Sequence, residues 1–409
     1  MSMKFEQKNI QWLTTLFVPM QDTNSTTVQI FVKAWSIYEN RKTNGISHFL
    51  EHMFFKWGKK YTTPASVAIA VESFGGEFNA YTGEEIASYY VKCPPAHAHK
   101  ALDVLADMMI HAQFPTDELE REKLVVVQEI KMYEDNPQAL VSEKRNTRYT
   151  GDNPYWRSIL WPEQNVMAFT REDLYAHQQA LYTKDNLILV IAGKIEDQQR
   201  LESDIATLFA DLPSSKKGWA APYQRMLPSS QSDFFDKKTE QNHLIISAPT
   251  FDYTDDRKYA AKLLATILGG NMSSRLFQNI REKLWLCYYI GARHSVTSYD
   301  GLFMIRAGID KERFEFWLEH IYAEIEKFVS EGITDEELVN AKSYLQGKLQ
   351  MGIESSDEMS EFVGSDMLLY HECKTLEDIM KYYDAVTKED IHALLYLLSK
   401  ENLYLYYIQ

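Results

Sequence analysis

The residues best suited to do chemistry form one short cluster, His48-Phe-Leu-Glu51-His52. On a helix, side chains four residues apart share a face about 5–6 Å apart, so His48 and His52 can offer their imidazole nitrogens to one metal ion. Glu51 precedes His52, and its carboxylate then lies beside the ion without having to bind it. A carboxylate in that place can take a proton from metal-bound water, whose pKa the metal lowers to about 7. The cluster therefore predicts a hydrolytic metal site with one ligand still missing.

A glutamate-rich helix, predicted over residues 115–133, can supply the missing ligand. Glu122 and Glu129 lie seven residues apart, nearly two helical turns, so they share a face but are separated by about 10 Å along the axis. Both cannot easily bind one ion. We expect one of them to be the third ligand and the other to orient a histidine ring.

The elements that must position these residues recur along the chain. Residues 115–123 resemble residues 334–342, and Phe169-Thr-Arg-Glu-Asp-Leu174 resembles Val386-Thr-Lys-Glu-Asp-Ile391. A third pair, residues 181–189 and 397–405, follows in the same order at a nearly constant offset. We interpret the chain as two similar halves of about 200 residues each.

The same register shows how the halves differ. Glu122 and Glu129 correspond to Ala341 and Lys348, and the histidine cluster falls opposite residues 267–271, which contain no histidine. The second half therefore keeps the scaffold and lacks the metal chemistry. The other histidines, including His97, His99, His111, His177 and His294, are expected on the surface or in packing.

Each half mixes strand and helix patterns, which predicts an α+β fold: two homologous domains, each a largely antiparallel sheet packed with several helices. Strands are predicted at residues 26–35, 187–192, 243–248, 286–293, 301–309 and 402–408, and helices at 96–112, 115–133, 312–329 and 335–351. Residues 213–232, rich in Pro and Ser, are interpreted as a linker between a zinc-carrying domain (1–212) and a second domain (233–409).

Composition restricts the functional class and the compartment. The chain of 409 residues is 45% hydrophobic and 25% charged, which is ordinary for a globular protein, and its net charge of −15 argues against nucleic acid or an anionic membrane as a partner. Three distant cysteines favour a reducing compartment. No apolar run is long enough to span a membrane, and the first residues have no signal-peptide pattern. We expect a cytoplasmic bacterial protein, with the mitochondrial matrix as the alternative.

With Glu129 placed 77 residues after His52, the H-x-x-E-H cluster resembles the pitrilysin/insulinase family of zinc metallopeptidases, also called inverzincins. The resemblance covers nearly the whole chain and extends to residues 44–56, 74–82 and 268–277. The length is similar to that of the half-size bacterial and mitochondrial-processing-peptidase branch. The resemblance implies one Zn²⁺ per chain bound by His48, His52 and Glu129, with Glu51 as general base and Glu122 supporting the site.

Two further groups of residues are implied to hold substrate. Residues 74–82 contain two glycines and then a short alternating strand, and an open strand edge can bind an extended peptide by β-augmentation. The resemblance assigns Asn79 and Ala80 to this role; the alternative is that Gly75 and Gly76 only make a turn and Asn79 only caps it. In the second half, Arg281 and Tyr288 resemble the family's Arg/Tyr pair, which holds substrate carbonyls and stabilises the oxyanion. Tyr289 is the alternative tyrosine.

The resemblance implies a metalloendopeptidase that hydrolyses peptides or unfolded segments in an enclosed chamber. A half-size chain supplies one half of the family's clam-shell. Because this chain carries both the zinc motif and the Arg/Tyr pair, we expect a homodimer with composite sites, and a heterodimer remains open. The alternatives are the catalytic subunit of a heterodimeric processing peptidase and, less consistent with an intact ligand set, a non-catalytic scaffold subunit.

Overall fold

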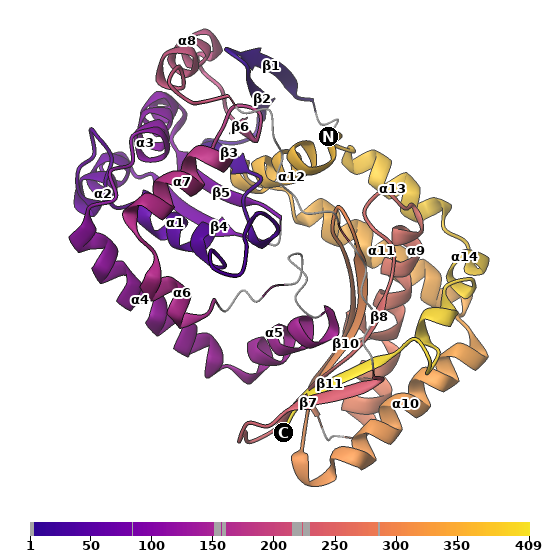
Figure 1. Cartoon of the computed structure of the whole chain (residues 1–409). Coiled ribbons are helices and arrows are strands. Elements are labelled where there is room, and N and C mark those ends of the chain that lie inside the picture. The colour runs from indigo at the N-terminus through magenta and orange to yellow at the C-terminus, as the bar shows by residue number, and fades with distance from the viewer. Residues whose placement is uncertain are drawn as a thin grey trace. The chain divides into compact units, whose positions relative to one another are not determined.

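Two compact units, each built on its own β-sheet, make up the chain (Figure 1). The computed structural model describes residues 4–83, 85–150, 157, 161–214, 223, 230–284 and 287–409. Unit 1 comprises residues 1–130, 159–222 and 351–375, and unit 2 comprises residues 131–158, 223–350 and 376–409. No helix in the described ranges is long and apolar enough to cross a membrane.

The unit 1 sheet has six strands in the order β1-β2-β6-β3-β5-β4. Its neighbours pair antiparallel except for the parallel pair β2 and β6. The bounds are β1 Glu6–Ile10, β2 Leu13–Pro19, β3 Thr26–Val32, β4 Glu77–Thr82, β5 Ala87–Cys93 and β6 Leu187–Gly193. Every residue of β3 and β6 is buried, which explains why both strands, apart from Gln29, consist of apolar and β-branched residues. β4 is the last strand of the sheet.

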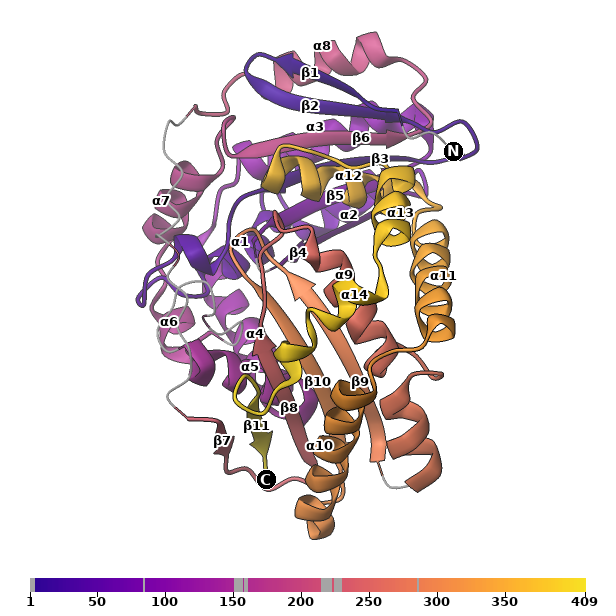
Figure 2. The same ribbon diagram turned by 90° about the vertical axis from the view of Figure 1, so that its right-hand side faces the viewer.

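Helices cover both faces of this sheet. One face packs on α12 (Ser356–Tyr370), which lies along β3 and β6 (Figure 2). The main core on the other face includes Phe49, Phe54 and Leu102. The remaining helices are α1 Ile46–Phe54, α2 Pro64–Glu72, α3 Ala98–Ile110, α4 Thr116–Glu134, α6 Glu163–Ala168, α7 Arg171–Leu181 and α8 Gln198–Leu208.

The unit 2 sheet has five strands in the order β7-β11-β8-β10-β9, and only β7 and β11 pair in parallel. The strands are β7 Ser232–Phe235, β8 Asn242–Pro249, β9 Cys287–Val296, β10 Gly301–Ile309 and β11 Tyr404–Ile408. Trp317 and Phe328 of α10 fill its core with Phe303. The α-helices are α5 Pro137–Thr150, α9 Arg257–Ala265, α10 Phe314–Glu331, α11 Asp335–Met351, α13 Leu376–Ala385 and α14 Lys388–His392.

The predicted α+β class, with a largely antiparallel sheet in each half, is confirmed. The units are not the contiguous stretches 1–212 and 233–409. Residues 131–158 of the first half belong to unit 2, and residues 351–375 of the second half belong to unit 1. α12 packs its apolar residues Val363 and Leu368 in unit 1, and α5 packs on β8 and β11 of unit 2. The chain changes unit between residues 222 and 223, inside the expected linker 213–232, most of which lies outside the described residues.

Candidate metal centre

Helix α1 carries the histidine cluster and is anchored by its apolar face. Phe49, Leu50 and Met53 are buried in the core, which leaves His48, Glu51 and His52 on the partly exposed side. The helix begins after Gly45 without a side-chain cap from its own N-terminal residue.

The buried carboxylate of Glu39 supplies that cap from outside the helix. It accepts hydrogen bonds from the backbone N–H of Gly45 at 2.8 Å and from that of Ser47 at 2.9 Å. Burial raises the pKa of Glu39 although these bonds oppose the shift. Glu39 therefore holds the start of the helix that carries the histidine cluster, and no local pattern in the sequence identified it.

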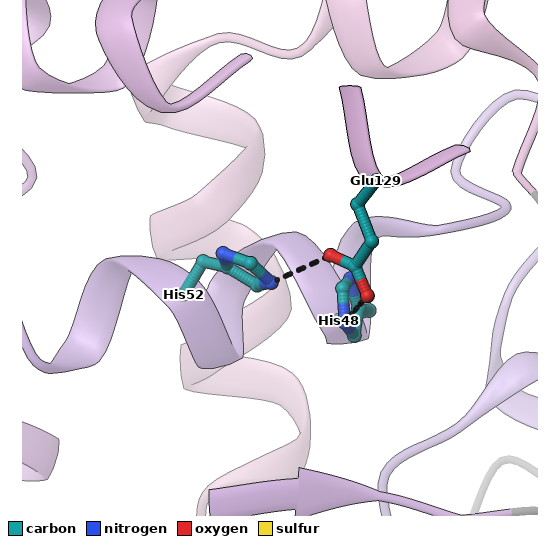
Figure 3. Close-up of side chains that lie close together, drawn as sticks. All are labelled: His48, His52 and Glu129. Carbon is teal, nitrogen blue, oxygen red and sulfur yellow. Dashed lines mark ion pairs between the residues drawn. The ribbon is translucent and has the colours of Figure 1, made fainter. Parts of the chain in front are cut away.

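His48, His52 and Glu129 converge (Figure 3). Nε2 of His52 lies 3.3 Å from Oε2 of Glu129, and Nε2 of His48 lies 3.8 Å from Oε1 of the same carboxylate. One ligand atom from each residue lies within 4.8 Å of the other two, and no other such group occurs among the described residues. Tetrahedral zinc with bonds of about 2.0–2.1 Å needs ligand atoms about 3.3 Å apart. The donor set and its spacing therefore fit zinc.

Glu122 lies on the far side of the His52 ring. Its Oε1 is 2.8 Å from Nδ1 of His52, and its Oε2 is 2.9 Å from Nζ of Lys56. Burial raises the pKa of Glu122, but the hydrogen bonds from His52 and Lys56 outweigh it and keep the pKa below its usual value. Of the two glutamates, Glu129 thus faces both histidines, and Glu122 orients one of them.

Glu122 and Glu129 also favour the protonated, positively charged form of the His52 ring. Burial alone would lower the pKa of His52, but hydrogen bonds to Glu122 and Glu129 raise it to about 9. A metal cation bound at Nε2 would replace the proton there. By contrast, burial holds the pKa of His48 well below its usual value, and His52 adds to this effect, so His48 presents a neutral imidazole to a cation.

Glu51 points to the end of the edge strand β4, where the hydroxyl of Thr82 donates a hydrogen bond to its carboxylate. Burial raises the pKa of Glu51 above its usual value with help from the charge of Glu129, and the hydrogen bond from Thr82 and the charge of His52 limit this rise. Thr82 was not singled out from the sequence. It belongs to the strand proposed to hold substrate, and so connects the base to that strand.

Asn79 and Ala80 lie within β4, paired with Tyr90 and Tyr89 of β5. The opposite edge of β4 has no partner among the described strands. The side chain of Asn79 accepts a hydrogen bond from the backbone N–H of Ala80 at 2.9 Å. The strand is therefore open on one edge, as β-augmentation requires.

Arg281 and Tyr288 belong to unit 2, whereas the candidate metal ligands His48, His52 and Glu129 belong to unit 1. Arg281 lies in the π-helix Phe277–Glu282, with its guanidinium 4.7 Å from the centre of the Phe277 ring. Tyr288 is the extra residue of a β-bulge, because Gly308 pairs with Tyr289 and Ile309 pairs with Cys287. Tyr288 is 74% exposed.

Tyr289, the alternative tyrosine, is occupied within unit 2. Its hydroxyl lies 3.1 Å from Nδ1 of the buried His243. Burial raises the pKa of Tyr289 to about 12, and the charge of Arg306 opposes this shift. Of the two tyrosines, Tyr288 is thus the exposed one, and its role at the site stays a prediction.

Comparisons with known proteins match two successive family models, which meet at residues 163–168 and not at the expected linker 213–232. Residues 16–163 match the family described as insulinase (peptidase family M16), and residues 168–345 match the peptidase M16 inactive domain. The chain is 35% identical to an uncharacterized zinc protease of Rickettsia felis over 90% of this chain and 88% of that protein. It is 34% identical to the uncharacterized zinc protease YmxG of Bacillus subtilis over 87% of this chain and 86% of that protein.

Solved structures share the whole fold. A protease from Helicobacter pylori superposes with a TM-score of 0.91 at 21% identity, covering 100% of both chains. A structure titled as a peptidase M16 inactive domain from Pseudomonas fluorescens superposes with a TM-score of 0.88 at 22% identity, covering 99% of this chain and 98% of that one. The topology described above is thus shared along its full length.

Proposed function

The chain belongs to the insulinase family, peptidase family M16, and from this premise we propose that it is a zinc-dependent endopeptidase acting on peptides or unfolded segments in an enclosed chamber. The observation that carries the proposal is the convergence of His48, His52 and Glu129. Glu51 lies on α1, the helix that carries both histidines. Two histidines and one glutamate form a catalytic type of zinc site that keeps one position open.

In this proposal His48, His52 and Glu129 hold zinc. When bound, zinc lowers the pKa of a water molecule and polarises the peptide carbonyl. Glu51 takes the proton from the attacking water and returns it to the leaving amine. The Thr82 hydroxyl keeps the Glu51 carboxylate directed to the end of β4.

The substrate is held through its main chain. The open edge of β4 at Asn79 and Ala80 offers backbone hydrogen bonds, which depend little on side-chain identity and suit broad specificity. Tyr288 donates a hydrogen bond to the developing oxyanion, and Arg281 holds a substrate carbonyl.

The test is hydrolysis of a quenched fluorescent peptide mixture by the purified chain beside its Glu51→Gln variant, with zinc content measured in both. We expect one zinc per chain in each protein and hydrolysis in the wild type only. Equal hydrolysis by both proteins would overturn the role of Glu51. Inactivity of both with zinc bound would favour the alternative functions: the catalytic subunit of a heterodimeric processing peptidase or a non-catalytic scaffold.

We further propose a homodimer in which Tyr288 of one subunit serves the zinc of the other. Support comes from the presence of both residue sets in one chain. The inactive variants Glu51→Gln and Tyr288→Phe, unfolded together and refolded as a mixture, would then form some dimers with one complete site, and activity would return. No recovery in mixed dimers, verified with two different affinity tags, would contradict the composite site.

We also propose that the protein works in a reducing compartment, most simply the bacterial cytoplasm. All three cysteines are free thiols, and the relatives named above come from bacteria. Fractionation of the source cells, followed by an immunoblot against cytoplasmic and periplasmic markers, tests the location.

A further inference from the structure

Trp161 packs its indole ring flat against the imidazole of the ligand His48. The ring centroids are 3.8 Å apart, and the ring planes differ by 19°. Only 4% of Trp161 is exposed, so its indole is covered by protein and cannot hold a substrate side chain. The contact therefore acts on His48 itself.

The two histidine ligands are supported in different ways. His52 has its Nδ1 hydrogen-bonded to Glu122 at 2.8 Å. Nδ1 of His48 is buried and has no hydrogen-bond partner among the described residues. Metal-binding histidines almost always use their second nitrogen to fix the ring through a carboxylate, a carbonyl or water. For His48, the flat contact with Trp161 restrains the ring plane, and the edge of the His52 ring, with its centroid 4.5 Å away, is the other ring contact.

The chain makes room for this indole at the start of α1. A Cβ atom on Gly45 would lie 2.4 Å from Cγ of Trp161, and the φ of Gly45 is +100°, a backbone conformation that side-chain-bearing residues rarely adopt. Glycine thus allows both the turn into α1 and the close approach of the indole.

A second contact fixes the position of Trp161 relative to the start of α1. Trp161 precedes Pro162, the residue just before α6. One turn on, the Asn165 amide donates hydrogen bonds to the backbone carbonyls of Arg41 at 2.8 Å and Asn44 at 3.2 Å, just before α1. The beginnings of the two helices are tied together, and this tie places the indole over His48.

We propose that Trp161 is a positioning residue that orients His48 for metal binding by stacking, as Glu122 orients His52 by hydrogen bonding. An imidazole that binds a cation becomes electron-poor, and the electron-rich face of an indole favours an electron-poor partner. The contact is therefore stronger when metal is bound and raises metal affinity. The inference rests on the proposed function only in requiring zinc at this site.

The test measures zinc dissociation constants by competition with a chromogenic chelator. Loss of an outer residue that orients a ligand usually weakens metal binding about 10- to 100-fold. We expect that loss in Trp161→Leu, retention of most affinity in Trp161→Phe, which keeps a flat ring, and no change in the control Trp12→Leu, whose side chain is 76% exposed. An unchanged dissociation constant in Trp161→Leu would overturn the proposal.

A double-mutant cycle separates orientation from general damage to the fold. If Trp161 acts through His48, Trp161→Leu weakens zinc binding in a His52→Ala background and has no further effect in a His48→Ala background. Isothermal titration with zinc measures the dissociation constants in both backgrounds. A variant without detectable binding is assigned the weakest affinity that the titration can measure. An equal loss in both backgrounds would overturn the proposal. Because peptide hydrolysis is not the readout, an inactive protein that binds zinc through the Trp161-supported site would contradict only the proposed peptidase activity.

Discussion

Oε1 of Glu122 lies 2.8 Å from Nδ1 of His52, and this contact separates the roles of two glutamates on the same face of α4. Glu129 reaches the other nitrogen of the same ring, at 3.3 Å. One carboxylate therefore lies among the candidate metal ligands, and the other contacts the far side of the ring. Lys56, 2.9 Å from the buried Glu122, completes this partly buried chain of charges.

Replacing Glu122 by Gln should weaken zinc binding about 10- to 100-fold while leaving the three ligands in place. The amide keeps the volume of the side chain but loses the charge that pairs with His52 and Lys56. Chelator competition measures the affinity. Glu118→Gln is a matched control one turn earlier on α4, where the glutamate pairs with the exposed Arg121. Equal affinities of the Glu122 and Glu118 variants would contradict this assignment.

Replacing Thr82 by Val should move the acid limb of the pH profile of kcat/KM to higher pH. The Thr82 hydroxyl lowers the pKa of Glu51 against the raising effect of burial, so losing it raises that pKa. Glu51 must be ionised to act as a base, and activity is then lost at a higher pH as the solution is acidified. A hydrogen bond to a charged group of about 1.5–3 kcal/mol corresponds to a shift of about one unit or more. Thr82→Ser keeps the hydroxyl, so its acid limb should lie at the same pH as in the wild type. An acid limb at the wild-type pH in Thr82→Val would argue against the contact.

Phenylalanine substitutions should distinguish the two adjacent tyrosines. Tyr288→Phe removes the exposed hydroxyl and should lower kcat about 100-fold or more, as loss of an oxyanion donor does. Tyr289→Phe removes a hydrogen bond to His243 and should lower the free energy of unfolding by about 1 kcal/mol with little effect on kcat. Steady-state kinetics and urea unfolding of both variants provide the comparison. A larger loss of kcat in Tyr289→Phe would reverse the assignment.

The buried His294 should make the protein less stable in mild acid. Its Nε2 lies 2.9 Å from the Thr250 hydroxyl, and burial, assisted by the charge of Lys262, lowers its pKa to about 3. An unfolded chain takes up this proton near pH 6.5, whereas the folded chain does so only near pH 3. The stabilisation from this group is therefore fully present above about pH 6.5, and it decreases as the pH falls toward 3.

Between pH 6.5 and pH 5 the expected loss from His294 is about 2 kcal/mol of unfolding free energy. Urea unfolding across this range measures it. His294→Gln can keep a hydrogen bond to Thr250 and cannot titrate, so its unfolding free energy should depend less on pH by that amount. Parallel pH profiles for the variant and the wild type would show that another group controls acid stability.

The sequence by itself determined which site residues share one face of a helix, because their spacing matches the helical period. His48 and His52 share a face because they are four residues apart, and Glu122 and Glu129 share a face because they are seven apart, whatever surrounds them. The same reasoning predicted the helices α3, α4, α10 and α11 close to their observed bounds. The internal repeat indicated two α+β halves of which only the first carries metal ligands.

Only the tertiary structure decided how residues distant in the chain support that site. Nothing local distinguishes Glu129 from Glu122 until α4 packs beside α1, and no spacing connects Thr82 with Glu51 or Trp161 with His48. The placement of α5 and α12 likewise depends on which sheet offers an apolar face to cover. Periodicity records which side of an element a residue occupies, whereas contacts between elements arise from burial and close packing of the folded chain, which sequence spacing does not encode.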